Sequence, residues 1–302
     1  MIEVAVVGSL HLDIVVAAPR LPARDETLIG SAWHTKCGGK GGNQAVAAAR
    51  FGAHTLFGGQ TGTDDFGDRL RANLVAAGVD LTHVGSDPGQ GSGMSVAITE
   101  AAGEYGAVVV SGANLTIDAA AITTGWARLW QAKLLLLQNE VPEAVNLAAA
   151  RAAKAAGARI IFNAAPARGM AGEMLDLTDV LVVNRVEARM LTGEDDPARA
   201  LRALHAPTRD VVLTRGGDGL MAMARDGARF DVPALPVKLL SSHGAGDCFC
   251  GALAARLAKG DALEAACRFA SAAAGLFVST PEERHAELDS KTVETMLGDW
   301  PG

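Results

Sequence analysis

The first candidate catalytic group in this sequence is Asp247, the last residue of the string GAGD that begins at Gly244 and precedes an apolar, helix-like stretch. Free backbone N–H groups and the dipole at such a helix start favour an anion, and we expect them to keep the carboxylate ionised. An ionised carboxylate can take the proton from a hydroxyl whose oxygen attacks phosphorus. An ordinary acid at a helix start, which stabilises by roughly 0.3–1 kcal/mol, explains the same string.

A second candidate site is the string CGGKGGNQA from Cys37, in which four glycines surround Lys40 and precede Asn43 and an alanine-rich helix. Glycine at this density allows close backbone approach, and Lys, Asn and Gln offer donors and acceptors for sugar hydroxyls. We favour ligand contact over a merely flexible glycine loop.

Carboxylates and amides follow three further apolar runs. Asp13 follows the first run and can accept hydrogen bonds from ligand hydroxyls, with a turn aspartate as the alternative. Glu140 follows LLLLQN directly. Asn184 and Glu187 have a spacing that turns an amide and a carboxylate toward the same space, which suits water-mediated magnesium beside phosphates. A helix cap and a solvated first-turn acid are the alternative for this pair.

One glycine-rich stretch, LTRGGDG from Leu213 to Gly219, has two adjacent glycines and a DG turn after a strand-like run. These features are typical of a hairpin, and a hairpin alone explains them. Contact with a nucleotide is the alternative.

Short apolar runs predict the strands that must position these groups, and their continuous apolarity suits strands buried on both faces. The helical stretches between them end at Gly52, Gly78 and Gly157. Alternating strands and helices predict an α/β fold with a parallel sheet, whose ligands bind beyond the carboxyl ends of the strands. The runs begin at Val4, Thr55, Leu134, Arg159, Val180 and Asp210.

Two segments interrupt this alternation. Residues 13–37 contain the β-like TLIGSAWHTK from Thr27, and the sequence from Met94 predicts a hairpin that turns near Ala102 and Gly103. We expect them to pair as a small accessory sheet. No linker or repeat divides the chain, so a single core domain over residues 1–302 is predicted.

Composition narrows the class of partner. With 302 residues, 49% of them apolar, the chain is long enough for a sizeable core. Its net charge of -7 and the absence of a Lys/Arg cluster disfavour nucleic acid and anionic membranes as partners. The apolar N-terminal stretch has no basic region before it and no run reaches membrane-spanning length, which predicts a cytoplasmic protein. The cysteines form no CxxC pair and predict buried free thiols at Cys37, Cys248, Cys250 and Cys267.

The sequence contains neither GxGxxG nor GxxxxGK[ST]. Instead GGKGGNQAVAAARFGA from Gly38, the NxxE spacing and GAGD, in this order, resemble the ribokinase-like family of carbohydrate kinases from Gly8 to about Val278. The resemblance implies a three-layer α/β sandwich with a mostly parallel central sheet and a small β-sheet lid, formed by about 13–37 and 93–111. It also implies transfer of the γ-phosphate of ATP, with Mg²⁺, to a primary hydroxyl of a pentose such as ribose, and a possible homodimer through the lid.

The same resemblance gives each candidate residue a role. Asp247 would be the general base, the three residues before it would form an anion hole, and Glu187 would bind Mg²⁺ through water. The anion hole comprises Gly244, Ala245 and Gly246; the sugar site comprises His11, Asp13, Gly39, Lys40, Asn43 and Glu140; the ATP site comprises Asn184, Thr214, Arg215, Gly216, Gly217, Asp218 and Gly219.

One departure from the family pattern concerns the substrate. His11 stands where the family has a sugar-binding Asn, and it is bulkier and titrates near neutral pH. The identity of the substrate therefore stays open, with a nucleoside kinase of the same fold as the alternative. A catalytically silent sugar-binding regulatory protein is the alternative from another class.

A second departure concerns a monovalent cation. Ser241 and Ser242 stand where the family often has Asp and Thr as part of a cation site, and the stretch from Ser279 lacks the glycine-containing loop that helps enclose the ion. We therefore expect potassium activation to be weak or absent. His243 has no counterpart role in the family and is assigned none.

Overall fold

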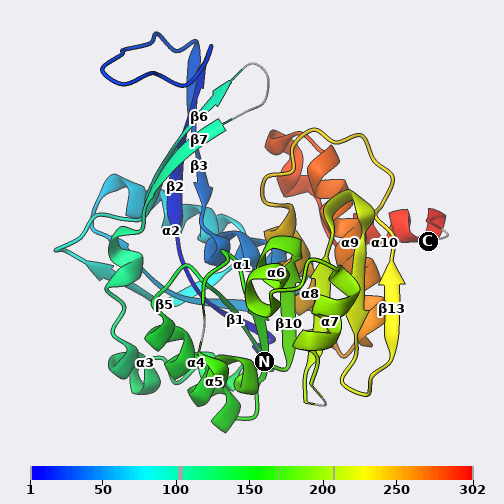
Figure 1. The fold of residues 1–302 in the computed structure, drawn as a ribbon. Helices are drawn as coiled ribbons and strands as arrows, with labels where there is room; N and C mark the ends of the chain where they lie inside the picture. The colour runs from blue at the N-terminus through cyan, green and yellow to red at the C-terminus, as the bar shows by residue number, and fades with distance from the viewer. Residues whose placement is uncertain (1, 101–104, 170, 207, 301–302) are drawn as a thin grey trace.

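The computed structural model describes residues 2–100, 105–169, 171–206 and 208–300 (Figure 1). Within these ranges nine strands form one sheet in the order β13-β12-β11-β10-β9-β8-β1-β4-β5, and four form a second in the order β3-β2-β6-β7. In the large sheet the pairings β11–β12 and β12–β13 are antiparallel and the others are parallel. All six predicted strand runs are confirmed. The strands are β1 Val4–Val7, β2 His11–Ala18, β3 Ala32–Gly38, β4 Thr55–Gly62, β5 Asp80–Asp87, β6 Met94–Glu100, β7 Tyr105–Val110, β8 Leu134–Gln138, β9 Arg159–Asn163, β10 Val180–Asn184, β11 Asp210–Thr214, β12 Leu220–Met223 and β13 Arg229–Val232.

Helices cover both faces of the large sheet, as the apolar runs require. Val4 and Val6 belong to a core shared with α1, α8 and α9, whereas Ala5 and Val7 belong to a core shared with α4 and α7. Successive strand residues thus face opposite helical layers, and the predicted three-layer α/β sandwich is confirmed. The helices are α1 Lys40–Arg50, α2 Asp65–Ala76, α3 Ala119–Gly125, α4 Glu143–Ala155, α5 Gly172–Leu177, α6 Arg185–Thr192, α7 Pro197–Leu204, α8 Ala245–Lys259, α9 Leu263–Ser279 and α10 Ser290–Asp299, with 3₁₀ turns at Gly112–Leu115, Leu129–Gln131, Gly216–Asp218 and Glu282–Glu287.

The second sheet extends away from the main body (Figure 1, top). Its strands come from the two segments that interrupt the βα alternation, and β2 pairs with both β3 and β6. The predicted β-like stretch from Thr27 is wrong in its first part, because β3 begins only at Ala32, which pairs with Ala17 close to the end of β2. β6 and β7 form the predicted antiparallel pair, and the predicted turn at Ala102 and Gly103 lies outside the described residues.

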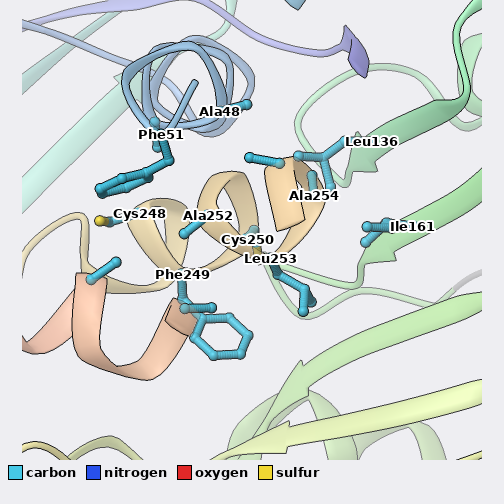
Figure 2. Packing of buried hydrophobic residues seen from close by; sticks show 14 of the residues in the cluster. Ala48, Phe51, Leu136, Ile161, Cys248, Phe249, Cys250, Ala252, Leu253 and Ala254 are labelled. Carbon is cyan, nitrogen blue, oxygen red and sulfur yellow. The ribbon is translucent and has the colours of Figure 1, made fainter. Parts of the chain in front are cut away.

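Helix α8 packs closely against α1. Figure 2 shows side chains of α1, α8 and the sheet meeting in one core, among them Phe51 and Leu136. Gly251 lies where the two helices cross: a Cβ at this position would be 2.5 Å from both the Ala47 Cβ and the Gln44 carbonyl oxygen. Real Cβ atoms do not approach so closely, so glycine at this position is what lets α1 and α8 touch.

The four cysteines are free thiols, as predicted; Cys248, Cys250 and Cys267 are buried, whereas Cys37 is only partly buried. In the described ranges no helix has the length and apolarity that crossing a membrane requires.

Candidate active site

The candidate residues lie around the carboxyl ends of neighbouring strands. Glu140 follows β8, while Asn184 and Thr214 end β10 and β11 and are register partners. Asp13, which follows the first apolar run in the sequence, lies inside β2 rather than in a turn. Its Oδ1 accepts a hydrogen bond of 2.5 Å from Ser95 Oγ on β6. The turn-aspartate alternative is therefore wrong, since the strand pairing of the second sheet fixes this carboxylate.

The carboxylate of Glu140 ties three segments together. Helix α1 begins earlier than the alanine-rich run suggests, at Lys40, and the Lys40 N–H donates to Glu140 Oε2 at 2.8 Å. The Ser9 hydroxyl, just after β1, donates to the same oxygen. His11 is 4% exposed, and its Nδ1 lies 3.7 Å from this oxygen. The start of α1, the end of β1 and the loop after β8 thereby take fixed relative positions.

Asp247 lies in the first turn of α8 and is 7% exposed. Asn43 Nδ2 donates to its Oδ2 at 3.0 Å, and Gln44 Nε2 donates to its Oδ1 at 3.0 Å. Each carboxylate oxygen has a second lone pair, so the group can still accept a proton. The two amides fix the orientation of the carboxylate without using up its capacity to accept.

Burial raises the pKa of Asp247, although the Lys40 charge and the Gln44 and Asn43 amides act in the opposite direction. The sequence predicts that the helix start keeps this carboxylate ionised. That expectation is corrected, because removal from water outweighs the favourable field of the helix and raises the pKa. A carboxyl group with a raised pKa is a better proton acceptor than an exposed one, as general base catalysis requires.

The beginning of α8 has no side-chain cap. Gly244 takes a left-handed conformation with φ of 81°, and the Ala245 N–H donates to the Ser242 carbonyl at 3.3 Å. The next N–H, that of Gly246, makes no hydrogen bond within the described part of the chain. An anion placed at this turn would meet unsatisfied donors and the positive end of the helix dipole.

Asn184 and Glu187 form a capping box at the start of α6. The Asn184 side-chain oxygen accepts from the Glu187 N–H, and Glu187 accepts from the Asn184 backbone N–H at 2.6 Å and from its side-chain amide at 2.8 Å. The helix-cap alternative thus describes Asn184 correctly. The solvated-acid alternative is wrong for Glu187, because this side chain is buried.

Glu187 fits a water-mediated contact to Mg²⁺. Burial raises its pKa, while the Asn184 backbone N–H and the Lys40 charge act against this rise. Mg²⁺ in phosphate-transfer sites keeps several waters and takes few carboxylates, and each Glu187 oxygen retains a lone pair for such a water. Among the described residues no cluster of three His, Cys, Asp or Glu side chains is arranged to hold a metal.

The LTRGGDG stretch is the predicted hairpin, since it joins β11 to the antiparallel β12. Arg215 contacts Asp231 at 3.3 Å, and Asp218 pairs with Arg185 at 2.5 Å. These two charged side chains therefore have protein partners, and the glycines between them present backbone to any ligand at the end of β11.

Ser9 and Ser95 were not singled out from the sequence, and Gln44 was expected to contact sugar hydroxyls rather than Asp247. Gln44 holds Asp247, Ser9 holds Glu140, and Ser95 holds Asp13. Ser9 was detectable as the first polar residue after an apolar run, and Gln44 as the neighbour of Asn43. Ser95 carries no sequence signal, because its contact depends on the pairing of β2 with β6.

A family model described as pfkB family carbohydrate kinase matches residues 1–289. The chain is 35% identical over 278 residues to a ribokinase of Bacillus subtilis, covering 92% of this chain and 93% of the relative. It is also 31% identical over 271 residues to a deoxyribokinase of Salmonella typhi, covering 87% of this chain and 88% of the relative.

The fold is also similar to solved structures. A ribokinase of Arabidopsis thaliana, complexed with ribose and ATP, superposes with a TM-score of 0.89 at 29% identity and covers 97% of this chain and 98% of its own. The agreement extends over both sheets, since it covers nearly the whole of each chain.

Proposed function

The chain belongs to the pfkB family of carbohydrate kinases, and we propose that it transfers the γ-phosphate of ATP to a primary hydroxyl of a pentose such as ribose. The observation that carries this proposal is the buried Asp247 carboxylate, held by two amides at the uncapped start of α8. The ribose and ATP bound by the similar Arabidopsis thaliana enzyme support both substrates.

In the proposed reaction Asp247 takes the proton of the sugar hydroxyl. The hydroxyl oxygen then forms a bond to the γ-phosphorus, the bond from that phosphorus to the bridging oxygen breaks, and ADP leaves with the electron pair. The backbone N–H groups at Gly244, Ala245 and Gly246 would stabilise the charge on the phosphoryl oxygens. Such donors lower the barrier because they stabilise charge that develops only during transfer.

The sugar side of the proposed site is the group tied together by Glu140. Its polar groups donate and accept, which suits several hydroxyls on one small molecule. Burial lowers the pKa of His11 more than Glu140 and Asp13 raise it, which favours the neutral imidazole. The proposed sugar-binding residues are His11, Asp13, Gly39, Lys40, Asn43 and Glu140.

The nucleotide side is proposed at the ends of β10 and β11. Glu187 would hold Mg²⁺ through water, and the ion, when bound, would neutralise phosphate charge. ATP as the donor agrees with the cytoplasmic location that the sequence predicts. The proposed ATP-binding residues are Asn184, Thr214, Arg215, Gly216, Gly217, Asp218 and Gly219.

A coupled assay of ADP release tests the function directly. We expect turnover with ribose or a close pentose, and the comparison should include deoxyribose, because one relative is a deoxyribokinase. Turnover with nucleosides but not free pentoses would favour the nucleoside kinase alternative. Sugar binding by calorimetry without any ADP release would favour the silent regulatory protein and contradict the proposal.

Lys40→Met should move the acidic limb of the kcat/KM profile to higher pH. The Lys40 charge lowers the pKa of Asp247 against the effect of burial, so its removal raises that pKa and the base stays protonated up to a higher pH. The pH dependence of kcat/KM for both proteins measures the shift. Lys238→Met, at an exposed loop position, is the control and should leave the limb in place.

Potassium should not activate the enzyme. Ser241 stands where the family often has an Asp in its cation site. Its backbone N–H donates to the Val278 carbonyl at 3.3 Å. Nearby, His285 Nε2 lies 3.0 Å from the Phe277 carbonyl and 2.9 Å from that of Thr280, so these two carbonyls already have a hydrogen-bond partner. Rates of ADP release with sodium, potassium or neither should agree, and strong stimulation by potassium alone would contradict this expectation.

The second sheet is proposed to act as a lid over the sugar and as a pairing surface for a second copy. Several apolar side chains on its strands are exposed, including Trp33 at 71% and Val108 at 69%. Exposed apolar groups on sheet strands favour burial against a partner. Sedimentation should show a dimer that Val108→Glu converts toward monomer; an unchanged sedimentation coefficient would argue against lid pairing.

A further inference from the structure

A cavity lies beside the candidate active site. It is bounded by the C-terminal end of β3, helix α1, the start of α8 and the chain after α9. Its volume is about 360 Å³, within the range of small-molecule pockets. Asn43 and Gly244 line it, so it shares a wall with the proposed sugar site and anion hole. The other residues proposed above for the sugar, ATP, Mg²⁺ and anion-hole sites are not among its lining residues.

The unusual feature of this cavity is Arg50, in the last turn of α1. The side chain is half-buried, yet within the described ranges it makes no hydrogen bond and no ion pair. Burial lowers the pKa of Arg50, and the neighbouring group that acts against this is the Cys248 thiol rather than a carboxylate. A guanidinium stays charged at any physiological pH, and a half-buried charge without a partner is unfavourable.

A second cation, Lys36, lines the same cavity and is also without a hydrogen bond or ion pair in the described part of the chain. Its charge lowers the pKa of His243, after the larger effect of burial, so the ammonium lies close to this side of the cavity. Glu282 and Glu283 also line the cavity, but both are exposed and neither contacts Arg50. The half-buried charge in the cavity is therefore positive.

We propose that this cavity is a binding site for a small organic anion, whose phosphate or carboxylate group pairs with Arg50 and Lys36. The planar fork of an arginine matches both groups through two parallel hydrogen bonds. Val46 and Phe277 supply apolar lining for the body of the molecule. The ligand would supply the ion partner that Arg50 lacks among the described residues.

The shared wall gives the site a way to act on the reaction. Asn43 contacts Asp247 and also lines the cavity, and Cys248, one residue after the base, forms part of the lining. An anion bound on Arg50 would therefore touch both helices that position the base. This regulatory effect rests on the proposed kinase function, whereas binding of the anion does not.

Calorimetric titration of the full chain with glycerol 3-phosphate and with malate tests the site, with neutral glycerol as the blank. We expect at least one anion to bind and glycerol not to bind. Arg50→Gln should weaken binding by about tenfold to a hundredfold, the value of a charge-assisted hydrogen bond pair. Arg202→Gln is the matched control, because Arg202 is an exposed arginine in the last turn of α7 and should not affect binding.

Three outcomes would overturn the proposal: no binding of either anion, equal binding by Arg50→Gln, or displacement of the bound anion by ATP. The last would place the anion at the nucleotide site instead. If Arg50→Gln fails to fold, Arg50→Lys keeps the charge but not the fork and should still weaken binding. Because these measurements need no turnover, a failure here leaves the ADP-release test intact, and the reverse also holds.

Discussion

Asp247→Asn should lower kcat by roughly 10²–10⁴-fold, the usual contribution of a positioned general base. The amide that replaces the carboxylate has nearly the same shape but cannot take the sugar hydroxyl proton. KM for the sugar should change much less, because Asn43 and the groups around Glu140 remain in place. Steady-state ADP release by the purified variant, with ribose varied, gives both constants.

Loss of folding does not account for the expected loss of activity. Burial raises the pKa of Asp247, so its cost in stability is absent below the unfolded pKa, grows as the pH rises toward the folded pKa and is complete above it. Asp247→Asn removes this cost at neutral pH but replaces one acceptor oxygen by an amide nitrogen that faces the Asn43 or Gln44 donor. The two effects oppose each other, so the melting temperature should stay close to that of the wild type. Asp68→Asn, an exposed first-turn acid of α2, is the control and should retain full activity. Retention of most of the rate by Asp247→Asn would refute the proposed mechanism.

Gly41→Ala should destabilise the fold by about 1–3 kcal/mol, the usual effect of overpacking. A Cβ at Gly41 would lie 2.6 Å from the Ser9 backbone nitrogen and 2.7 Å from two backbone atoms of Gly8. These are backbone atoms and cannot rotate away, so the start of α1 must shift. Activity should fall as well, because the same turn carries the Lys40 N–H and Asn43.

Thermal melts and ADP release measure the two effects of Gly41→Ala. The matched control is Gly125→Ala, at the last residue of α3, where an added Cβ meets no atom within 4 Å. Alanine is the better helix former, so this control should be neutral or slightly more stable. Equal melting temperatures for Gly41→Ala and wild type would contradict the close packing of α1 on the loop after β1.

Much of the scaffold was predictable because its signals are local. Buried parallel strands such as Leu134–Gln138 are uninterrupted apolar runs, and glycines end the helices between them with positive φ at Gly52, Gly78 and Gly157. The place of Asp247 at a helix start followed from GAGD alone. What that aspartate does became interpretable only beside the glycine string and the NxxE spacing.

The remaining features depend on contacts between distant segments. A turn position remained an alternative for Asp13 in the sequence, but pairing of β2 with β3 and β6 places it inside a strand, where Ser95 contacts it. The direction in which the pKa of Asp247 shifts depends on how far the start of α8 is buried. No local sequence pattern reports this burial. Gln44 and Asp247 are 203 positions apart, so their hydrogen bond could not be inferred from spacing.

The contact between α1 and α8 at Gly251, where a Cβ does not fit, limits which substitutions the two helices can accept. It joins α1, which carries the proposed sugar contacts Lys40 and Asn43, to α8, which carries Asp247, so the two helices change together or not at all. A change of sugar specificity at His11, which lies on β2 beside Glu140, would leave this contact between the two helices in place.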